Sequence, residues 1–407
     1  MKINALFIGA VASFCLNSTV NAEILKDTTA NLYLKNFYFD RNFNDENTRD
    51  LSNWSQAATL EIKSGYTDTP IQFGLDLSAR YAYRLSSAKN IVDNVMPYDY
   101  SKQQQAQDQL KLGATAKIKY SNTEIKIGEV IPKLPIVHTD VVMQLPTTFL
   151  GGILESTEIK NTKFTLGRLT KVSGRNSEDY SKFQLVNGNN KAQSDALDFA
   201  GLDYDFNDQQ IRYFYAKLEN IYDQHFLSYE LRHAFTDNTK LKSNFYIFDS
   251  YESGDSLEGK IDSQVYATIH MLNHGNHTFG VGYKYNSGDT SFPLLANWVP
   301  QVYSANWSVG TYMQQGERSW QIRYDYDFKD TPLNGLKSTI RYYDGDHIKK
   351  GDITNGTEKE LDLILNYEFQ QQQLKGLGMS WLLADYKNSL AKNYIENRVA
   401  LYFNYKF

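Results

Sequence analysis

The sequence predicts an all-β protein, a transmembrane antiparallel β-barrel of about 18 strands with short turns at one end and long loops at the other. Three observations lead to this prediction. Large apolar residues alternate with polar ones over many segments, the chain ends on an aromatic strand, and no apolar run reaches the roughly 20 residues of a membrane helix. The composition agrees, with 30 Tyr, 22 Phe, only 8 Pro and a mean hydropathy of -0.52.

The first 22 residues are predicted to be a cleaved signal peptide. Lys2 supplies a positive charge, residues 5–16 form an apolar run too short to span a membrane, and residues 20–22 form a cleavage site. We therefore expect residues 23–407 to be a single barrel domain. The only cysteine, Cys15, lies in the removed segment, so the mature chain needs no disulfide and has no thiolate ligand for zinc.

The alternation is clearest at residues 319–328. Trp320, Ile322 and Tyr324 are apolar or aromatic, whereas Gln321 and Arg323 between them are polar. Because successive strand side chains point to opposite faces, one face would contact lipid and the other a water-filled lumen.

The same pattern predicts the remaining strands in chain order. Together with 319–328 they are residues 31–39, 54–66, 71–84, 110–120, 124–130, 154–160, 163–171, 197–206, 210–218, 226–235, 240–248, 263–271, 278–285, 336–344, 360–369, 377–387 and 395–407. Pairs such as Asn161-Thr162 and Asn207-Asp208 are typical turn residues. We assign residues 306–313 to a loop, because a further strand would make the count odd and place the two termini on opposite sides of the membrane.

Two long segments are expected to fold into the lumen, residues 131–153 and residues 286–318. The first is apolar but contains three prolines, which a central strand does not tolerate. Residues 86–109 are polar and Gln-rich, and we expect an exposed loop there. The last strand ends at Phe407 and must pair with the first, because only a closed barrel satisfies every backbone group in lipid. We also expect this strand to engage the barrel-assembly machinery.

Over essentially the whole mature chain the sequence resembles the OprD family of substrate-specific outer-membrane porins. The matching stretches include residues 35–41 (KNFYFDR), 122–129 (NTEIKIGE), 145–149 (LPTTF) and 341–346 (RYYDGD). The resemblance implies a Gram-negative outer-membrane channel, narrowed by inward-folded loops, that takes up small carboxylate-bearing nutrients. Outer-membrane lipid and lipopolysaccharide are the expected surroundings.

The resemblance also implies a ladder of basic side chains down one wall of the lumen, facing acidic groups. A carboxylate can step between guanidinium groups, because arginine is always charged and offers two parallel donors. The candidates on polar faces are Lys35, Arg41, Arg80, Arg323, Arg341, Lys387 and Arg398. Candidates for the opposing wall and the constriction are His138, Asp140, Asp325 and Asp327, although Asp325 and Asp327 could instead hold the cations in place. The alternative for each residue is an ordinary solvated lumen charge.

The sequence departs from the family pattern near the constriction. Residues 138–143 contain no arginine, residues 380–383 are largely apolar, and Lys35 stands where relatives carry arginine. A thinner ladder beside a more apolar constriction favours an aromatic or aliphatic acid over a basic amino acid.

Other functional classes fit less well. A general diffusion porin with little selectivity is the main alternative, because it differs only in how far the loops close the pore. An outer-membrane hydrolase is disfavoured, because neither residues 138–140 nor Arg232-His233 lie near a nucleophile elbow. With 42 basic and 47 acidic residues the chain is not a nucleic-acid binder, and it shows no phosphate loop or zinc-protease spacing, so we expect no cofactor and no metal.

Overall fold

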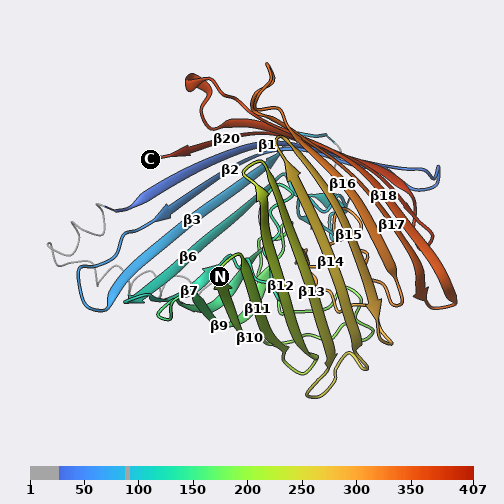
Figure 1. The fold of residues 1–407 in the computed structure, drawn as a ribbon, viewed down its shortest axis with the longest axis horizontal. Helices are drawn as coiled ribbons and strands as arrows, with labels where there is room; N and C mark the ends of the chain where they lie inside the picture. Colours follow the sequence, from blue (N-terminus) through green and yellow to red (C-terminus); the bar gives the residue numbers. More distant parts are fainter. Residues whose placement is uncertain (1–26, 88–91) are drawn as a thin grey trace.

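The computed structural model describes residues 27–87 and 92–407 (Figure 1). The predicted signal peptide, residues 1–22, lies outside the described residues. Within the described ranges, no helix has the length and apolar character needed to cross a bilayer.

Eighteen antiparallel strands form one sheet that closes on itself, as predicted. Closure occurs where β1 pairs with β2 on one side and with β20 on the other. The barrel strands are β1 (Thr29–Phe43), β2 (Leu51–Lys63), β3 (Gln72–Arg84), β6 (Asp108–Tyr120), β7 (Thr123–Val130), β8 (Thr148–Ser156), β9 (Thr162–Ser173), β10 (Leu197–Phe206), β11 (Gln209–Leu218), β12 (Tyr222–Thr236), β13 (Thr239–Glu252), β14 (Asp262–His274), β15 (His277–Ser287), β16 (Arg318–Asp327), β17 (Leu336–Lys350), β18 (Ile353–Glu368), β19 (Leu377–Asn388) and β20 (Tyr394–Lys406). Outside the barrel wall, β4 (Tyr98–Asp99) pairs with β5 (Gln104–Gln105), and η1 (Gln372–Leu374) is a single helical turn.

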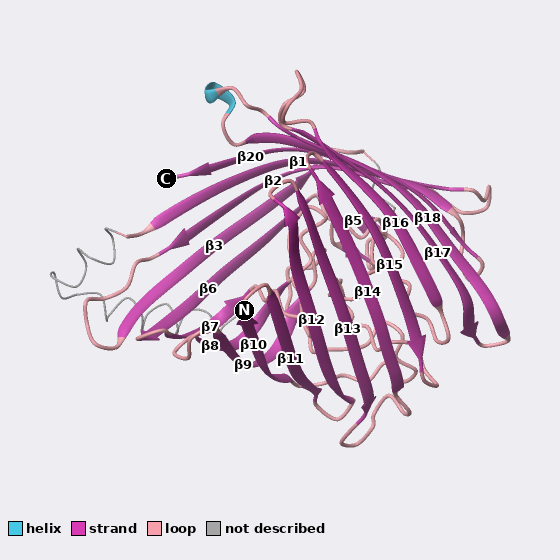
Figure 2. Cartoon of the chain, in the orientation of Figure 1, coloured by secondary structure: helices cyan, strands magenta, loops and turns pink. Residues whose placement is uncertain are grey.

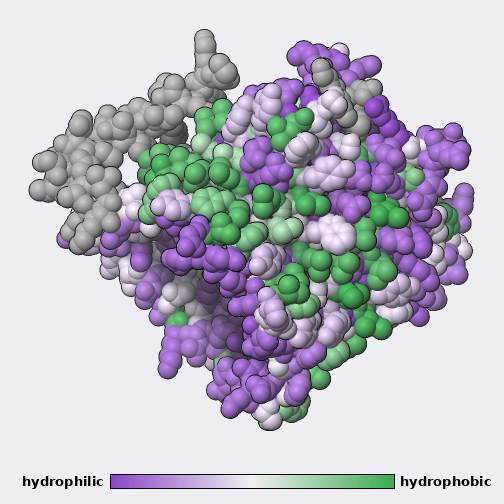
Figure 3. Space-filling view, turned by 90° about the horizontal axis from the view of Figure 1, so that it is seen from above, coloured by the Kyte–Doolittle hydropathy of each residue, from purple (hydrophilic) through white to green (hydrophobic). Residues whose placement is uncertain are grey.

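Several strands bury polar side chains and expose apolar ones. In β16, Trp320 and Ile322 are 41% and 54% exposed, whereas Ser319 and Gln321 are 0% and 3% exposed. This inversion of the soluble pattern is expected when the outer face contacts lipid and the inner face lines a polar lumen. Figure 3 shows apolar residues gathered over the middle of one face, with hydrophilic residues toward its edges.

Four segments fold back into the barrel, two more than the sequence predicts: residues 92–107, 131–147, 174–196 and 288–317. Residues 288–317 do so as expected, and residues 306–313 contain no strand. Residues 86–109 were expected to form an exposed loop, and this is wrong for the part of that segment that the structure describes. Val95 and Met96 are buried, Val95 against Phe37 and Phe39 on the barrel wall. Val95 and Met96 are apolar residues in a mostly polar segment, so the average composition of the segment did not predict their burial.

The first inward loop is shorter than predicted, because it ends at residue 147 and β8 begins at Thr148. The error comes from Gly151 and Gly152, which read as loop residues. In the structure Gly151 pairs with Gly128 in the ladder, and a Cβ on Gly151 would lie 2.2 Å from the carbonyl oxygen of Arg168. The glycine allows a close approach of two strands at a β-bulge.

An apolar core fills one side of the lumen. Aromatic side chains on the inner face of β10 to β13 pack against three of these four loops, 131–147, 174–196 and 288–317; they are Phe199, Phe214, Phe226 and Phe248, with Ile136, Leu185 and Phe292 from the loops. Figure 2 shows these loop segments inside the barrel, behind β12 to β15. Among the described residues, none on β16 to β20 belongs to this apolar core.

Gly201 makes room for one of these aromatic rings, which gives a stability prediction. A Cβ on Gly201 would lie 2.1 Å from Cε1 of the fully buried Phe214. We expect Gly201→Ala to destabilise the barrel by about 1–3 kcal/mol through overpacking. Urea unfolding in detergent, followed by the heat-modifiable gel shift, measures it. Gly152→Ala is the matched control, because its new Cβ would meet nothing closer than 3.7 Å, and equal stability of the two variants would contradict the prediction.

Candidate functional site

A row of charged side chains crosses six neighbouring strands on the lumen face. Directly paired positions run from Arg323 on β16 through Arg341, Asp362, Ala384 and Glu396 to Arg41 on β1. We call these six residues the ladder row. Because barrel strands tilt by about 35–45°, a row perpendicular to the strands descends along the lumen instead of circling it at one depth.

The upper part of the ladder row is a carboxylate held between two arginines. Glu396 accepts hydrogen bonds from Nε of Arg41 at 2.6 Å and from Nε of Arg398, its neighbour on β20, at 2.6 Å. The Glu396 side chain is fully buried, whereas those of Arg41 and Arg398 remain 22% and 16% exposed. The cluster therefore presents one positive charge in excess to the lumen.

The lower part of the row contains two further arginines, each paired with one acid. Nη2 of Arg341 lies 2.7 Å from the buried Oδ2 of Asp362, and Nε of Arg323 lies 2.8 Å from Oδ2 of Asp325. Arg323 is the more accessible, with 32% of its side chain exposed. The structure thus brings four of the predicted basic residues together along one wall.

The other three predicted basic residues lie elsewhere. Lys35 faces the lumen, but its Nζ is buried under loop 131–147 and donates to the carbonyl oxygen of Met143 at 2.5 Å. Arg80 is 1% exposed on β3 and pairs with Glu129 at 2.7 Å.

Lys387 lies on the outer face of β19, so its place in the predicted lumen ladder is wrong. The lumen-facing residues of this strand are Leu382, Ala384 and Tyr386, and Lys387 has the opposite phase. It pairs with Asp385 on the same outer face at 3.3 Å. Residues 381–383 are apolar on both faces, so alternation alone did not reveal the phase of this strand.

The residues predicted for the opposing wall and the constriction lie in two places, strand β16 and loop 131–147. Asp325 and Asp327 lie on β16 with Arg323 and flank the ladder row, so they do not form an opposing wall. Asp140 lies in loop 131–147, close enough to Arg398 for the two charges to interact. His138 lies in the same loop, where burial lowers its pKa below the usual range and keeps it neutral at pH 7.

Arg175 connects the inward loops, and the sequence did not identify it as a site residue. Its Nη1 lies 2.6 Å from Oδ2 of Asp140, its Nε donates to the carbonyl oxygen of Asn94 at 3.1 Å, and its guanidinium lies 3.9 Å from the ring centroid of Trp298. These partners come from three different loops. Two signals in the sequence could have identified it. The stretch Arg175-Asn176-Ser177 matches the family, and residues 138–143 contain no arginine.

The tip of loop 288–317 is fixed to the barrel wall beside the ladder row. Both carboxylate oxygens of Glu360 accept backbone N–H groups, from Val309 at 3.0 Å and Gly310 at 2.8 Å. The buried Lys284 donates to the carbonyl oxygen of Asn306 at 2.6 Å. At the end of the loop, burial and the neighbouring Glu358 raise the pKa of Glu317 well above its usual range. These contacts hold loop 288–317 against the barrel wall, and none of them followed from strand periodicity.

Comparison with known proteins places this arrangement among channels. A family model described as "outer membrane porin, OprD family" matches residues 22–407. The chain is 28% identical to the porin-like protein GalP of Pseudomonas putida over 390 residues, 94% of this chain and 93% of the relative. Among solved structures it is similar to OccAB4 of Acinetobacter baumannii, with 34% identity, a TM-score of 0.90 and coverage of 93% and 98%. It is also similar to OpdK of Pseudomonas aeruginosa solved with vanillate, with 28% identity, a TM-score of 0.89 and coverage of 94% and 100%.

Proposed function

Because the chain belongs to the OprD family of porins of the bacterial outer membrane, we propose that it is a passive, selective channel for small carboxylate-bearing nutrients. Selectivity is assigned to the ladder row together with Arg398. The main alternative, a general diffusion porin, lacks such a preference and is the opposite outcome of the test below.

The excess positive charge at Arg41, Glu396 and Arg398 is the observation that carries the proposal. Two partly exposed guanidinium groups share one buried carboxylate, which leaves donor capacity free for the two oxygens of a solute carboxylate. Farther down, Arg341 and Arg323 repeat the arrangement with one acid each. Partial neutralisation at every step keeps each binding step weak, and a permeating solute must be able to leave each site.

The apolar side chains beside the row favour an aromatic or aliphatic acid. Arg398 pairs in the ladder with Leu382, which in turn pairs with Ile364 on the lumen face of β18. These two residues give the hydrocarbon part of a solute an apolar surface next to the cationic groups. The similar channel OpdK was solved with vanillate, an aromatic carboxylate, and this supports the same substrate class here.

Single-channel conductance of the refolded mature protein in a planar bilayer tests the proposal. We expect a small conductance interrupted by benzoate-dependent blocks, which become rarer and shorter in Arg323→Ala and Arg341→Ala. Arg232→Ala is the matched control, because Arg232 is an exposed, ion-paired arginine on the other side of the barrel. A large conductance that is indifferent to benzoate would identify a general porin, and liposome uptake that prefers arginine over benzoate would overturn the substrate class.

A further inference from the structure

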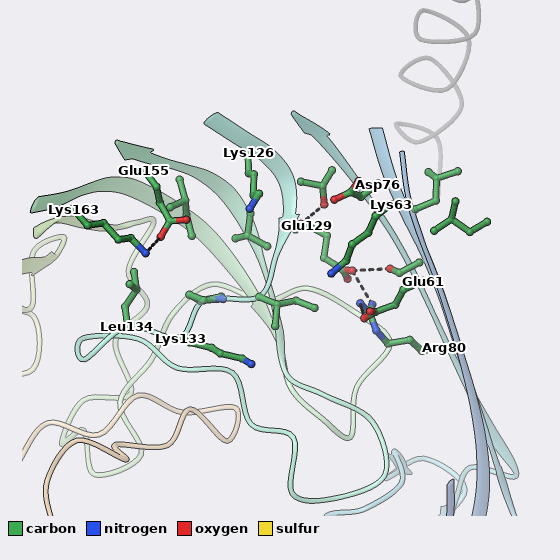
Figure 4. Close-up of a pocket in the computed structure, with 18 residues that line it drawn as sticks. Glu61, Lys63, Asp76, Arg80, Lys126, Glu129, Lys133, Leu134, Glu155 and Lys163 are labelled. Carbon is green, nitrogen blue, oxygen red and sulfur yellow. Dashed lines mark hydrogen bonds and ion pairs between the residues drawn. The ribbon is translucent and has the colours of Figure 1, made fainter. Parts of the chain in front are cut away.

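A cavity of about 370 Å³ lies on the barrel wall away from the ladder row, between the strand ends and the start of loop 131–147 (Figure 4). Lys63 ends β2, Lys126 lies near the start of β7 and Lys163 near the start of β9. These strand ends carry the short turns, which face the periplasm in outer-membrane barrels. A solute that has passed the constriction would meet this cavity on its way out.

More cationic than anionic side chains line the cavity. Most of its acids already have cationic partners: Glu129 is 2.7 Å from Arg80, Asp76 is 2.6 Å from Lys117, and Glu155 pairs with Lys163. Glu61 is the exception, with its only ion pair at 3.9 Å from Arg80.

Two exposed lysines of the cavity have no such compensation. In the part of the chain that the structure describes, neither Lys63 nor Lys133 forms an ion pair. In Figure 4 the side chains of Lys63, Lys126 and Lys133 reach toward the middle of the cavity from three different segments. Lys126 pairs with Glu124 at 3.0 Å, and Glu124 does not line the cavity.

Apolar side chains form the remaining surface of the cavity. Pro132 and Leu134 come from loop 131–147, and Ile153 comes from β8. The cavity therefore offers cationic groups to the charged ends of a solute and apolar side chains to a short hydrocarbon middle.

We propose that this cavity is an exit-side binding site for a small organic dianion, a dicarboxylate, with Lys63 and Lys133 each receiving one carboxylate. The inference rests on the proposed function and extends it with a second binding step. Two ammonium groups without ion pairs attract a dianion more strongly than a monocarboxylate, because a monocarboxylate carries only one negative charge. A weak site below the constriction would also draw the solute off the last arginine, because conduction proceeds through several weak sites in series.

Sided addition of succinate to single oriented channels tests the proposal. Succinate on the periplasmic side is expected to block the wild-type channel. Block lifetime should fall roughly tenfold in Lys63→Ala or Lys133→Ala, the loss expected for one charge-assisted contact, and blocks should vanish in the double variant. Lys63→Arg keeps the charge and should retain the blocks. Lys242→Ala, at an exposed lumen lysine on another wall, is the control.

Two results would overturn the proposal: no succinate block of the wild type from the periplasmic side, or unchanged blocks in the double variant. The heat-modifiable gel shift verifies that every variant is folded. Benzoate blocks from the extracellular side report on the ladder row and should be the same in wild type and double variant. Their absence from the wild type would count against the proposed function, which separates the failure of one proposal from that of the other.

Discussion

Arg398→Ala is expected to weaken carboxylate binding in the lumen by roughly 10- to 100-fold, the factor that corresponds to about 1.5–3 kcal/mol for one charge-assisted hydrogen bond. In the native channel Arg41 and Arg398 share Glu396, and one positive charge remains available to the solute. Without Arg398, Glu396 neutralises Arg41 and the excess charge disappears. Benzoate block of single channels, measured as association rate and lifetime, gives the loss directly.

Arg398→Lys is the informative companion variant. Lysine keeps the charge but offers a point donor in place of the planar fork, so binding should fall by less than in Arg398→Ala. Glu396→Gln should act in the opposite direction, because it removes the anion that competes with the solute, and it should lengthen the blocks. If benzoate blocks Arg398→Ala as it blocks the wild type, the excess positive charge of Arg41 and Arg398 does not bind the solute.

The second large effect is expected at Arg175, where alanine should widen the constriction and raise the conductance several-fold. Arg175 joins loops 92–107, 131–147 and 288–317 through Asn94, Asp140 and Trp298. Its removal leaves the Asp140 side chain, 6% exposed, without its ion-pair partner Arg175, and breaking a buried pair in this way costs about 3–5 kcal/mol. Since that cost falls on loop packing, we expect the barrel to stay folded while the loops move apart.

The matched control for Arg175 is Arg168→Ala. Arg168 also contacts two acids, Asp198 and Glu219, but its side chain is 57% exposed on the outer face. Exposed pairs contribute about 0–1 kcal/mol, so conductance should not change. Adding Asp140→Asn to Arg175→Ala removes the uncompensated charge and should restore part of the narrow state. Equal conductance of Arg175→Ala and wild type would show that the loops hold their positions without this contact.

Much of the barrel follows from local pattern alone. Strand alternation repeats every two residues, so Trp320 and Gln321 reveal their faces without any knowledge of neighbouring strands. The parity argument correctly placed residues 306–313 in a loop. The local pattern failed where it was ambiguous, at Lys387 beside a strand segment that is apolar on both faces, and at Gly151, whose close strand contact resembles a loop signal.

The sequence by itself determined that this chain makes a closed membrane barrel of about 18 strands with a polar lumen, because hydrocarbon outside and water inside impose opposite side chains on alternate positions. Only the tertiary structure decided which charges meet. The alignment of Arg323, Arg341, Asp362, Glu396 and Arg41 in one row depends on the register of six strands that span most of the chain. The contact of Arg175 with three loops, like the cavity between Lys63 and Lys133, depends on how distant segments pack inside the lumen. Such long-range packing leaves no periodic trace in the sequence.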